Sequence, residues 1–192
     1  MRSLSSYIKD HTKGFTVGGT QSDKILIFDV DDTLIHTTAN IWVMKNGKHI
    51  KTLTNKEFND YKPNPGELFD YREFEDPIIL SKERFTKYWS TLKREYQKGT
   101  HISILTARSN CDMIRQFFLN NGIDIKKQLV FAVDDPKLDL HGTIQQRKAV
   151  VIKYLYELGY KTMVFFDDNE GNLKTAKSLE KIYNIKIHVV KT

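Results

Sequence analysis

The stretch KILIFDVDDT, Lys24 to Thr33, runs from apolar residues directly into three aspartates and a threonine. A second apolar run, residues 163–166, ends in the same way at Asp167 and Asp168. Continuous apolar runs are typical of parallel strands buried on both faces, and such sheets bind ligands outside the carboxyl ends of their strands. Both acidic clusters are therefore expected at one edge of a parallel sheet.

Carboxylates gathered at one edge of a sheet repel one another, which makes it costly to ionise all of them. A divalent cation that prefers oxygen ligands relieves this repulsion. The two acidic clusters therefore predict a Mg²⁺ site.

The length, the cysteine count and the apolar segments of the chain limit the class of protein to which it can belong. Its 192 residues suit one domain with a full hydrophobic core and a small insertion. The single cysteine, Cys111, cannot form an internal disulfide, and the first residues lack the apolar segment of a signal peptide, which favours a reducing, cytoplasmic location. No apolar stretch is long enough to span a bilayer, so no membrane partner is expected.

The charge balance is basic, with 30 Lys and Arg against 24 Asp and Glu, a net charge of +6. An excess of positive charge favours phosphorylated or polyanionic partners through long-range attraction. The alternative is a lysine-rich surface that only contacts solvent.

The order of predicted elements indicates the fold. Residues 1–23 read as an N-terminal arm or linker, and residues 24–192 as one domain with an insert at about 38–80. In the insert, Asn46-Gly47 predicts a hairpin between residues 41–44 and 49–53, whereas the prolines of 55–80 predict irregular structure. Apolar periodicity then predicts helices at 81–98, 110–121, 143–158 and 172–183, alternating with strands at 101–105, 129–133, 162–166 and 186–190. This alternation predicts an α/β fold with a mostly parallel sheet and helices on both faces.

The first acidic cluster has the residue types that phosphate chemistry needs. Asp29, at the end of a buried strand, would be held rigidly enough to attack phosphorus and form an aspartyl-phosphate. Asp31 would act as general acid and base, and Thr33 offers a hydroxyl and a backbone N–H to a phosphoryl oxygen. Alternatively, Asp and Thr in this spacing form only a turn or a helix cap.

The motif FDVDDTL resembles the first motif of the haloacid dehalogenase (HAD) superfamily of phosphohydrolases, and further motifs follow in order. The resemblance implies a HAD-like, Rossmann-like core. It also implies that Thr106, at the end of ISILTAR, binds the transferring phosphoryl group and that Lys148 neutralises nucleophile and phosphate together. Arg147 and Lys153 are the alternatives to Lys148.

The acidic pair in VFFDDNEGN resembles the fourth motif of the same superfamily. The resemblance implies that Asp168 binds Mg²⁺ directly beside Asp29 and the backbone carbonyl of Asp31. Asp167 would then support the metal through water or a hydrogen bond, although the sequence leaves the choice between Asp167 and Asp168 open. Asn172 would hold a metal-bound water.

The resemblance implies that the insert selects the substrate, and this insert is too short for a full cap domain, so an open site is expected. The chain is also similar to the 3′-phosphatase domain of phage-type polynucleotide kinase/phosphatases, which implies a nucleotide or a nucleic-acid phosphate end, such as a 3′-phosphate. Arg108 would bind a second phosphate or is a surface arginine. The insert aromatics Trp42, Tyr61, Phe69 and Tyr71 are expected either to stack on a base or to pack a small core of their own.

We therefore expect a Mg²⁺-dependent phosphomonoesterase. The alternatives are a phosphatase of another small metabolite and a binding protein that retains the fold without turnover.

Overall fold

The computed structural model describes residues 23–126 and 129–192, so the predicted N-terminal arm lies almost entirely outside the described residues. The main sheet has five strands in the order β10-β9-β1-β7-β8, and every neighbouring pair is parallel. The strands are β1 (Lys24–Phe28), β7 (His101–Thr106), β8 (Val130–Ala132), β9 (Thr162–Asp167) and β10 (Lys186–Lys191).

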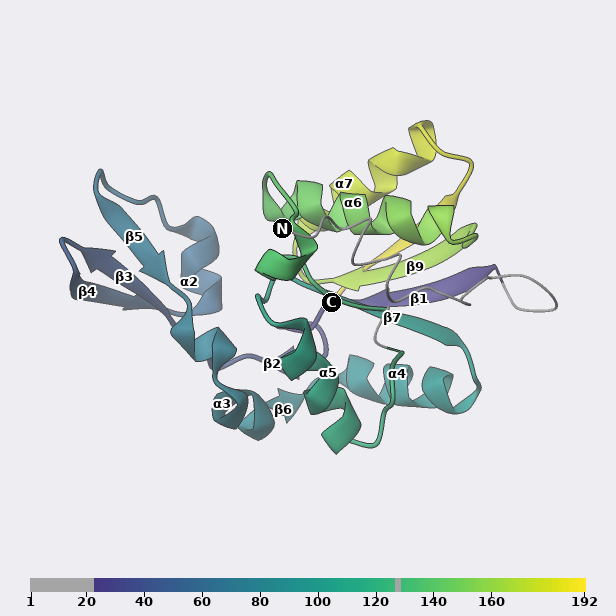
Figure 1. Cartoon of the computed structure of the whole chain (residues 1–192), viewed down its shortest axis with the longest axis horizontal. Helices are drawn as coiled ribbons and strands as arrows, with labels where there is room; N and C mark the ends of the chain where they lie inside the picture. The colour runs from purple at the N-terminus through teal and green to yellow at the C-terminus, as the bar shows by residue number, and fades with distance from the viewer. Residues whose placement is uncertain (1–22, 127–128) are drawn as a thin grey trace.

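Helices cover both faces of this sheet (Figure 1). Helices α6 (Ile144–Glu157) and α7 (Glu170–Ser178) lie on one face, and α4 (Lys87–Gln97) and α5 (Cys111–Asn120) lie on the other. Two short 3₁₀ helices, η3 (Pro136–Leu138) and η4 (Leu179–Lys181), complete the core. The predicted α/β class with a parallel sheet is confirmed, and the arrangement is consistent with a Rossmann-like fold.

Burial on both sides explains why the central strands are largely apolar. Ile25, Ile27 and Phe28 of β1 are fully buried, and the Phe28 ring stacks on Phe166 of β9 at a centroid distance of 4.4 Å. Aromatic rings in such contact contribute beyond the area that they bury. The two strands whose ends carry the acidic clusters are thus fixed side by side.

The strand order also predicts where a ligand binds. From β1 the chain first builds β7 and β8 on one side and then crosses to build β9 and β10 on the other. In open α/β sheets, ligands bind outside the carboxyl ends of the strands at this change of direction. Here that point lies between β1 and β9.

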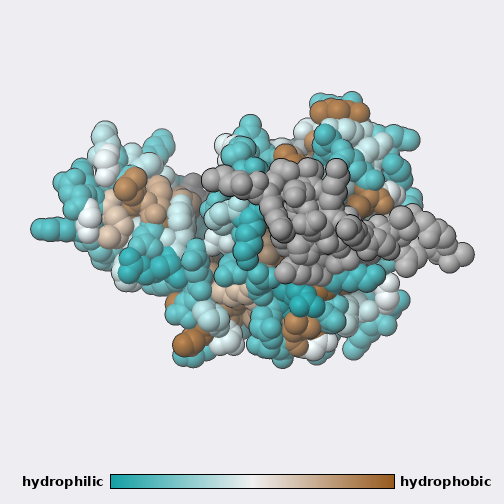
Figure 2. All heavy atoms as spheres, in the orientation of Figure 1, coloured by the Kyte–Doolittle hydropathy of each residue, from teal (hydrophilic) through white to brown (hydrophobic). Residues whose placement is uncertain are grey.

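The insert forms a second, three-stranded antiparallel sheet, seen at the left of Figure 1. Its strands are β3 (Ile41–Lys45), β4 (Lys48–Leu53) and β5 (Glu67–Asp70), and α2 (Asn55–Asp60) packs on one face. The predicted hairpin is confirmed, since Asn46 and Gly47 have the positive φ angles of 50° and 73° that its turn requires. Figure 2 shows apolar surface over the insert, where Leu68 is 71 % exposed.

The prediction of irregular structure at 55–80 is wrong. Thr54 and Glu57 form a reciprocal capping box that starts α2, and the short strand β5 pairs with β3. The 3₁₀ helix η1 (Arg72–Glu75) follows, and the Asp76 side chain then caps α3 (Pro77–Lys82). These elements are each too short for a periodic pattern, so local capping and strand pairing decide them.

The single helix predicted at 81–98 is also wrong in its first part. After α3, the strand β6 (Arg84–Phe85) pairs with β2 (Ile35–His36), and α4 begins only at Lys87 because the Thr86 side chain caps it. Phe85 therefore lies outside the helix, although it still stacks on Trp89 at a centroid distance of 4.0 Å. The β2–β6 pair is called the neck below, because the insert leaves and rejoins the core through it.

Helix α7 likewise begins before the predicted residue 172, since Asn169 caps it and Glu170 is its first residue. It ends at Ser178 and continues as η4. Within the part of the chain that the structure describes, none of the helices combines the length and apolar character needed to cross a bilayer.

Candidate active site

The two acidic clusters meet at the carboxyl ends of β1 and β9, as predicted. The strands pair in register up to Phe28 and Phe166, and the backbone N–H of Asp29 donates to the Phe166 carbonyl at 2.9 Å. One carboxylate oxygen from each of Asp29, Asp167 and Asp168 lies within 4.8 Å of the others. Three carboxylates so close together are costly to ionise unless cations lie among them.

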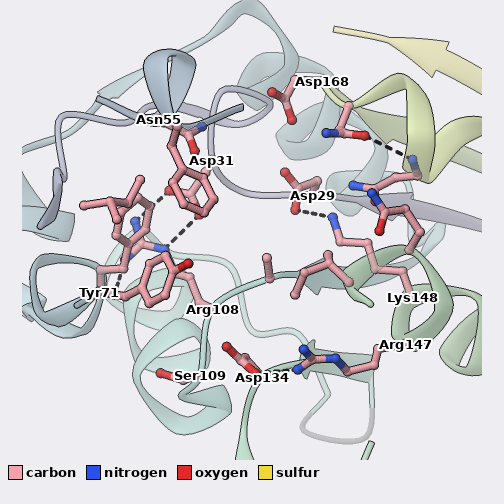
Figure 3. Close-up of a pocket in the computed structure, with 18 of the residues that line it drawn as sticks. Asp29, Asp31, Asn55, Tyr71, Arg108, Ser109, Asp134, Arg147, Lys148 and Asp168 are labelled. Atoms are coloured by element: carbon pink, nitrogen blue, oxygen red, sulfur yellow. Dashed lines mark hydrogen bonds and ion pairs between the residues drawn. The ribbon is translucent and has the colours of Figure 1, made fainter. Parts of the chain in front are cut away.

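The first of these cations is Lys148, which reaches the cluster from α6 (Figure 3). Its Nζ donates to Asp29 Oδ1 at 2.9 Å and to Asp167 Oδ2 at 2.8 Å. Burial alone lowers the pKa of this ammonium, but the charges of the two aspartates outweigh burial and hold the pKa above its usual value. Lys148 is therefore charged, and only 3 % of its side chain is exposed.

The other cations considered from the sequence lie elsewhere. Arg147 pairs with Asp134 on the same side of the site, and Lys153 pairs with Glu157 at 3.5 Å on the surface of α6. Lys148 is thus the member of this group that contacts Asp29.

One ammonium leaves the cluster with excess negative charge. Burial raises the pKa of Asp29; Lys148 counteracts this, and Asp167, Asp168 and Asp31 raise the pKa further. Burial, together with the charge of Asp167, also raises the pKa of Asp168 to about 6. A second cation at this site would relieve both carboxyls.

The two aspartates at the end of β9 differ in what they can still bind. Asp167 is fully buried, and both of its oxygens are engaged: Oδ1 accepts from the Asn169 N–H at 2.8 Å, and Oδ2 accepts from Lys148. The Asn172 amide donates to both oxygens, at 2.9 and 3.0 Å. Asp168 instead lines a cavity, and the buried Oδ1 of Asn172 has no hydrogen-bond partner.

Asp31 is held by Arg108, which follows β7. The guanidinium donates from Nε to Asp31 Oδ2 at 3.0 Å and from a second nitrogen to Oδ1 at 2.7 Å. A third N–H reaches the Phe74 carbonyl in the insert at 2.5 Å. Only 1 % of the Arg108 side chain is exposed, so this arginine is a built part of the site and the surface alternative is wrong.

The two threonines predicted to bind phosphate are buried and are not among the residues that line the cavity. Thr106 ends β7 fully buried, and its hydroxyl accepts the backbone N–H of Arg108 at 3.3 Å. Thr33 is also buried, and its hydroxyl shares a hydrogen bond with that of Thr192 at 3.0 Å.

A cavity of about 420 Å³ joins these groups and separates the core from the insert. Its core side carries the charged side chains Asp29, Asp31, Arg108, Asp134, Arg147, Lys148 and Asp168 (Figure 3). Its insert side is mostly apolar, with Ile41, Phe58, Tyr71 and Phe74 beside Asn55 and Glu75. Of the four insert aromatics considered from the sequence, Tyr71 lines the cavity, whereas Tyr61 and Phe69 pack the insert's own core.

Several lining residues escaped the sequence analysis. Asp134 follows the strand β8, so the rule that located Asp29 and Asp167 at strand ends could have located it too. Asn55, Phe58 and Phe74 carried no such signal, because the fold of the insert decides that they face the core.

The core side therefore offers two differently supported carboxylates, Asp29 on an ammonium and Asp31 on a guanidinium, with Asp168 beside them. Comparison with protein-family models, curated proteins and solved structures finds no match to this chain. The chemistry of the site has to follow from these side chains and the cavity that they share.

Proposed function

We propose that the chain is a Mg²⁺-dependent phosphomonoesterase of the HAD type, with Asp29 as nucleophile. The observation that carries the proposal is the environment of Asp29. Its carboxylate ends a buried strand, accepts Lys148 on one oxygen and lines a cavity that also contains Asp31, Arg108 and Asp168. A nucleophile fixed in this way is oriented for in-line attack on phosphorus.

The residues fit a magnesium ion. Asp29 and Asp168 would hold it, with the backbone carbonyl of Asp31, since oxygen ligands suit Mg²⁺. Asp167 would position its neighbours instead, because both of its oxygens are already engaged. Asn172 Oδ1, which has no hydrogen-bond partner, would accept from a water that the ion carries. When bound, the ion would offset the charge of the carboxylates and of the phosphoryl oxygens.

In the first step Asp29 attacks phosphorus, the bond to the leaving oxygen breaks, and that oxygen takes a proton from Asp31. In the second step water attacks the phosphorus of the aspartyl-phosphate and gives a proton to Asp31. The bond between Asp29 and phosphorus then breaks, which releases phosphate and regenerates Asp29. Lys148 stays charged throughout and stabilises the developing negative charge.

The hydrogen bonds of Asp31 limit how these two reaction steps can proceed. Both of its oxygens accept hydrogen bonds from Arg108, so the acid role proposed for Asp31 involves a change in this pair. We propose that a phosphoryl oxygen takes over one of these hydrogen bonds when substrate binds, which frees an Asp31 oxygen for the proton. Thr106 supports the exchange by holding the backbone N–H of Arg108.

The insert side of the cavity favours a nucleotide or a nucleic-acid phosphate end over a sugar phosphate. Phe58, Tyr71 and Phe74 offer aromatic surface on which a base can stack. A sugar would need a denser set of hydrogen-bonding groups than this wall provides, because each buried hydroxyl requires a partner.

The test is Mg²⁺-dependent phosphate release from 3′- and 5′-phosphorylated oligonucleotides, mononucleotides and sugar phosphates. Asp29→Asn is the blank and is expected to fold but release no phosphate, whereas Asp124→Asn, at an exposed aspartate, is the matched control and should retain activity. Preference for sugar phosphates would favour a metabolite phosphatase. Failure of the wild-type protein on every substrate would favour a binding protein.

A further inference from the structure

Asp32 has an unusual backbone for its residue type. Its φ angle is 54°, in the left-handed region that favours glycine and that aspartate and asparagine tolerate best among the other residues. It lies between Asp31, which faces the cavity, and Thr33, which is buried. Residues 29–33, called the catalytic loop below, turn at Asp32, whose side chain contacts Thr37 and Asn55.

The Asp32 carboxylate connects the catalytic loop to the insert. Oδ1 accepts the backbone N–H of Thr37 at 3.3 Å, just beyond β2 of the neck. Oδ2 accepts the Asn55 amide at 2.7 Å. Asn55 is the first residue of α2 and itself lines the cavity.

Other contacts hold the insert at different places. Arg108 and Ser109 bind the 3₁₀ helix η1, through the Phe74 carbonyl and the Glu75 carboxylate. Glu83 accepts the N–H of Thr38 at 2.7 Å beside the neck. The Asp32–Asn55 hydrogen bond acts instead at α2, the helix that presents Phe58 to the cavity.

We propose that Asp32 is a positioning residue that holds α2, and with it the Phe58 wall, over the nucleophile through its hydrogen bond to Asn55. When the bond breaks, the insert tilts away while the catalytic loop stays in place. The structural part of this inference stands alone, and its kinetic part rests on the proposed phosphatase function.

Asn55→Asp breaks the pair and leaves the helix intact. It sets two carboxylates against each other, and no side-chain flip can relieve the repulsion, but an acid in the first turn favours a helix through its dipole. The double variant Asp32→Asn with Asn55→Asp exchanges the partners. The amide introduced at position 32 can donate to the carboxylate introduced at position 55 while its oxygen accepts from Thr37, and asparagine tolerates the left-handed backbone.

The first readout needs no substrate. Spin labels at K48C on β4 and K153C on α6 report the distance between insert and core by electron paramagnetic resonance. The native Cys111 is buried, and burial raises the pKa of its thiol to about 12, so it does not compete for the label. We expect a narrow distance distribution for the wild-type sequence, a broad one for Asn55→Asp and a narrow one again for the exchanged pair.

The second readout separates positioning from chemistry. With a nucleotide substrate, Asn55→Asp should raise KM about tenfold, as the loss of one hydrogen bond to a charged group implies. The leaving group of acetyl phosphate is too small to reach the insert, so its kcat/KM should fall less than that of the nucleotide. The exchanged pair should recover the nucleotide KM.

The inference is overturned by an unchanged distance distribution in Asn55→Asp, or by an exchanged pair as broad as the single variant. Equal losses on both substrates would also overturn it. If the wild-type protein hydrolyses nothing, the proposed function fails, but the distance measurement still decides the role of Asp32.

Discussion

The two sheets of this protein differ in how they are stabilised. The five-stranded sheet is covered on both faces, and residues such as Leu105 and Phe165 are fully buried. The insert sheet buries only the small cluster Ile41, Val43 and Leu53 with partly buried aromatics against it, and exposes apolar surface elsewhere. The charged groups of the site thus lie on a rigid layer, whereas its apolar wall lies on a layer positioned by a few polar contacts.

The largest effect should come from removing the cation in the rigid layer. In Lys148→Met, Asp29 and Asp167 lose their buried partner, so metal-free protein should lose about 3–5 kcal/mol of its free energy of unfolding. Urea denaturation in EDTA measures this, with Lys153→Met on the same helix as the control. A loss no greater than that of the control would show that the carboxylates do not depend on Lys148.

A matched pair of core truncations tests whether the layers unfold separately. Leu105→Ala should lower the stability of the whole domain by about 2–5 kcal/mol, whereas Leu53→Ala should melt the insert alone. Trp42 reports the insert and Trp89 the core, so single-tryptophan variants distinguish the two transitions by fluorescence. Coincident transitions in Leu53→Ala would mean that the layers form one cooperative unit.

The difference in burial between the two sheets also decided which parts of the fold could be predicted from the sequence. Long apolar runs ending in acids located the strands and the meeting of Asp29 with Asp167, because burial on both faces leaves a continuous pattern. Lys148 was preferred to its neighbours only through the resemblance to the HAD superfamily, which expects a cation near the start of the helix before β9. The insert left no comparable pattern, since α2 has six residues and its start depends on one capping box.

The parts of the site missed by the sequence analysis arise from tertiary placement. Nothing local shows that Asn55 binds Asp32 or that the Phe74 carbonyl binds Arg108. Equally, nothing local shows that the hydroxyl of Thr33 would be shared with Thr192 and not directed at the cavity.

Asp168 should make the stability of the rigid layer depend on pH. Folding raises its pKa from 3.8 to about 6, so the folded state binds the proton more tightly than the unfolded chain. The stabilisation of the folded state by this proton is complete below about pH 4 and is lost as the pH rises through 6. Metal-free Asp168→Asn, which stays neutral, should therefore exceed wild type by about 1–2 kcal/mol at pH 8, after allowing for solvent screening, and match it near pH 4.

Urea denaturation at both pH values in EDTA checks this difference. Saturating Mg²⁺ should reverse the order at pH 8, because the ion stabilises only the protein that keeps the carboxylate. Equal stability of the two proteins at both pH values would show that Asp168 is not strained by its neighbours.

The smallest effect should come from one polar contact of the insert. Ser109→Ala removes the hydrogen bond to Glu75, and the melting of the insert should shift by about 0.5–1 kcal/mol while the core transition stays unchanged. The Trp42 and Trp89 variants measure both transitions in one titration. A shift of the core transition as well would mean that this contact stabilises both layers.

The neck is a position at which the insert could be replaced by another segment. Ile35 pairs with Phe85 and His36 with Arg84, so the polypeptide leaves the core and returns to it at adjacent positions. Segments whose ends lie together can be lengthened, shortened or replaced at small entropic cost. Other inserts could therefore be grafted between these two strands, which would replace one wall of the cavity and leave the charged groups of the core unchanged.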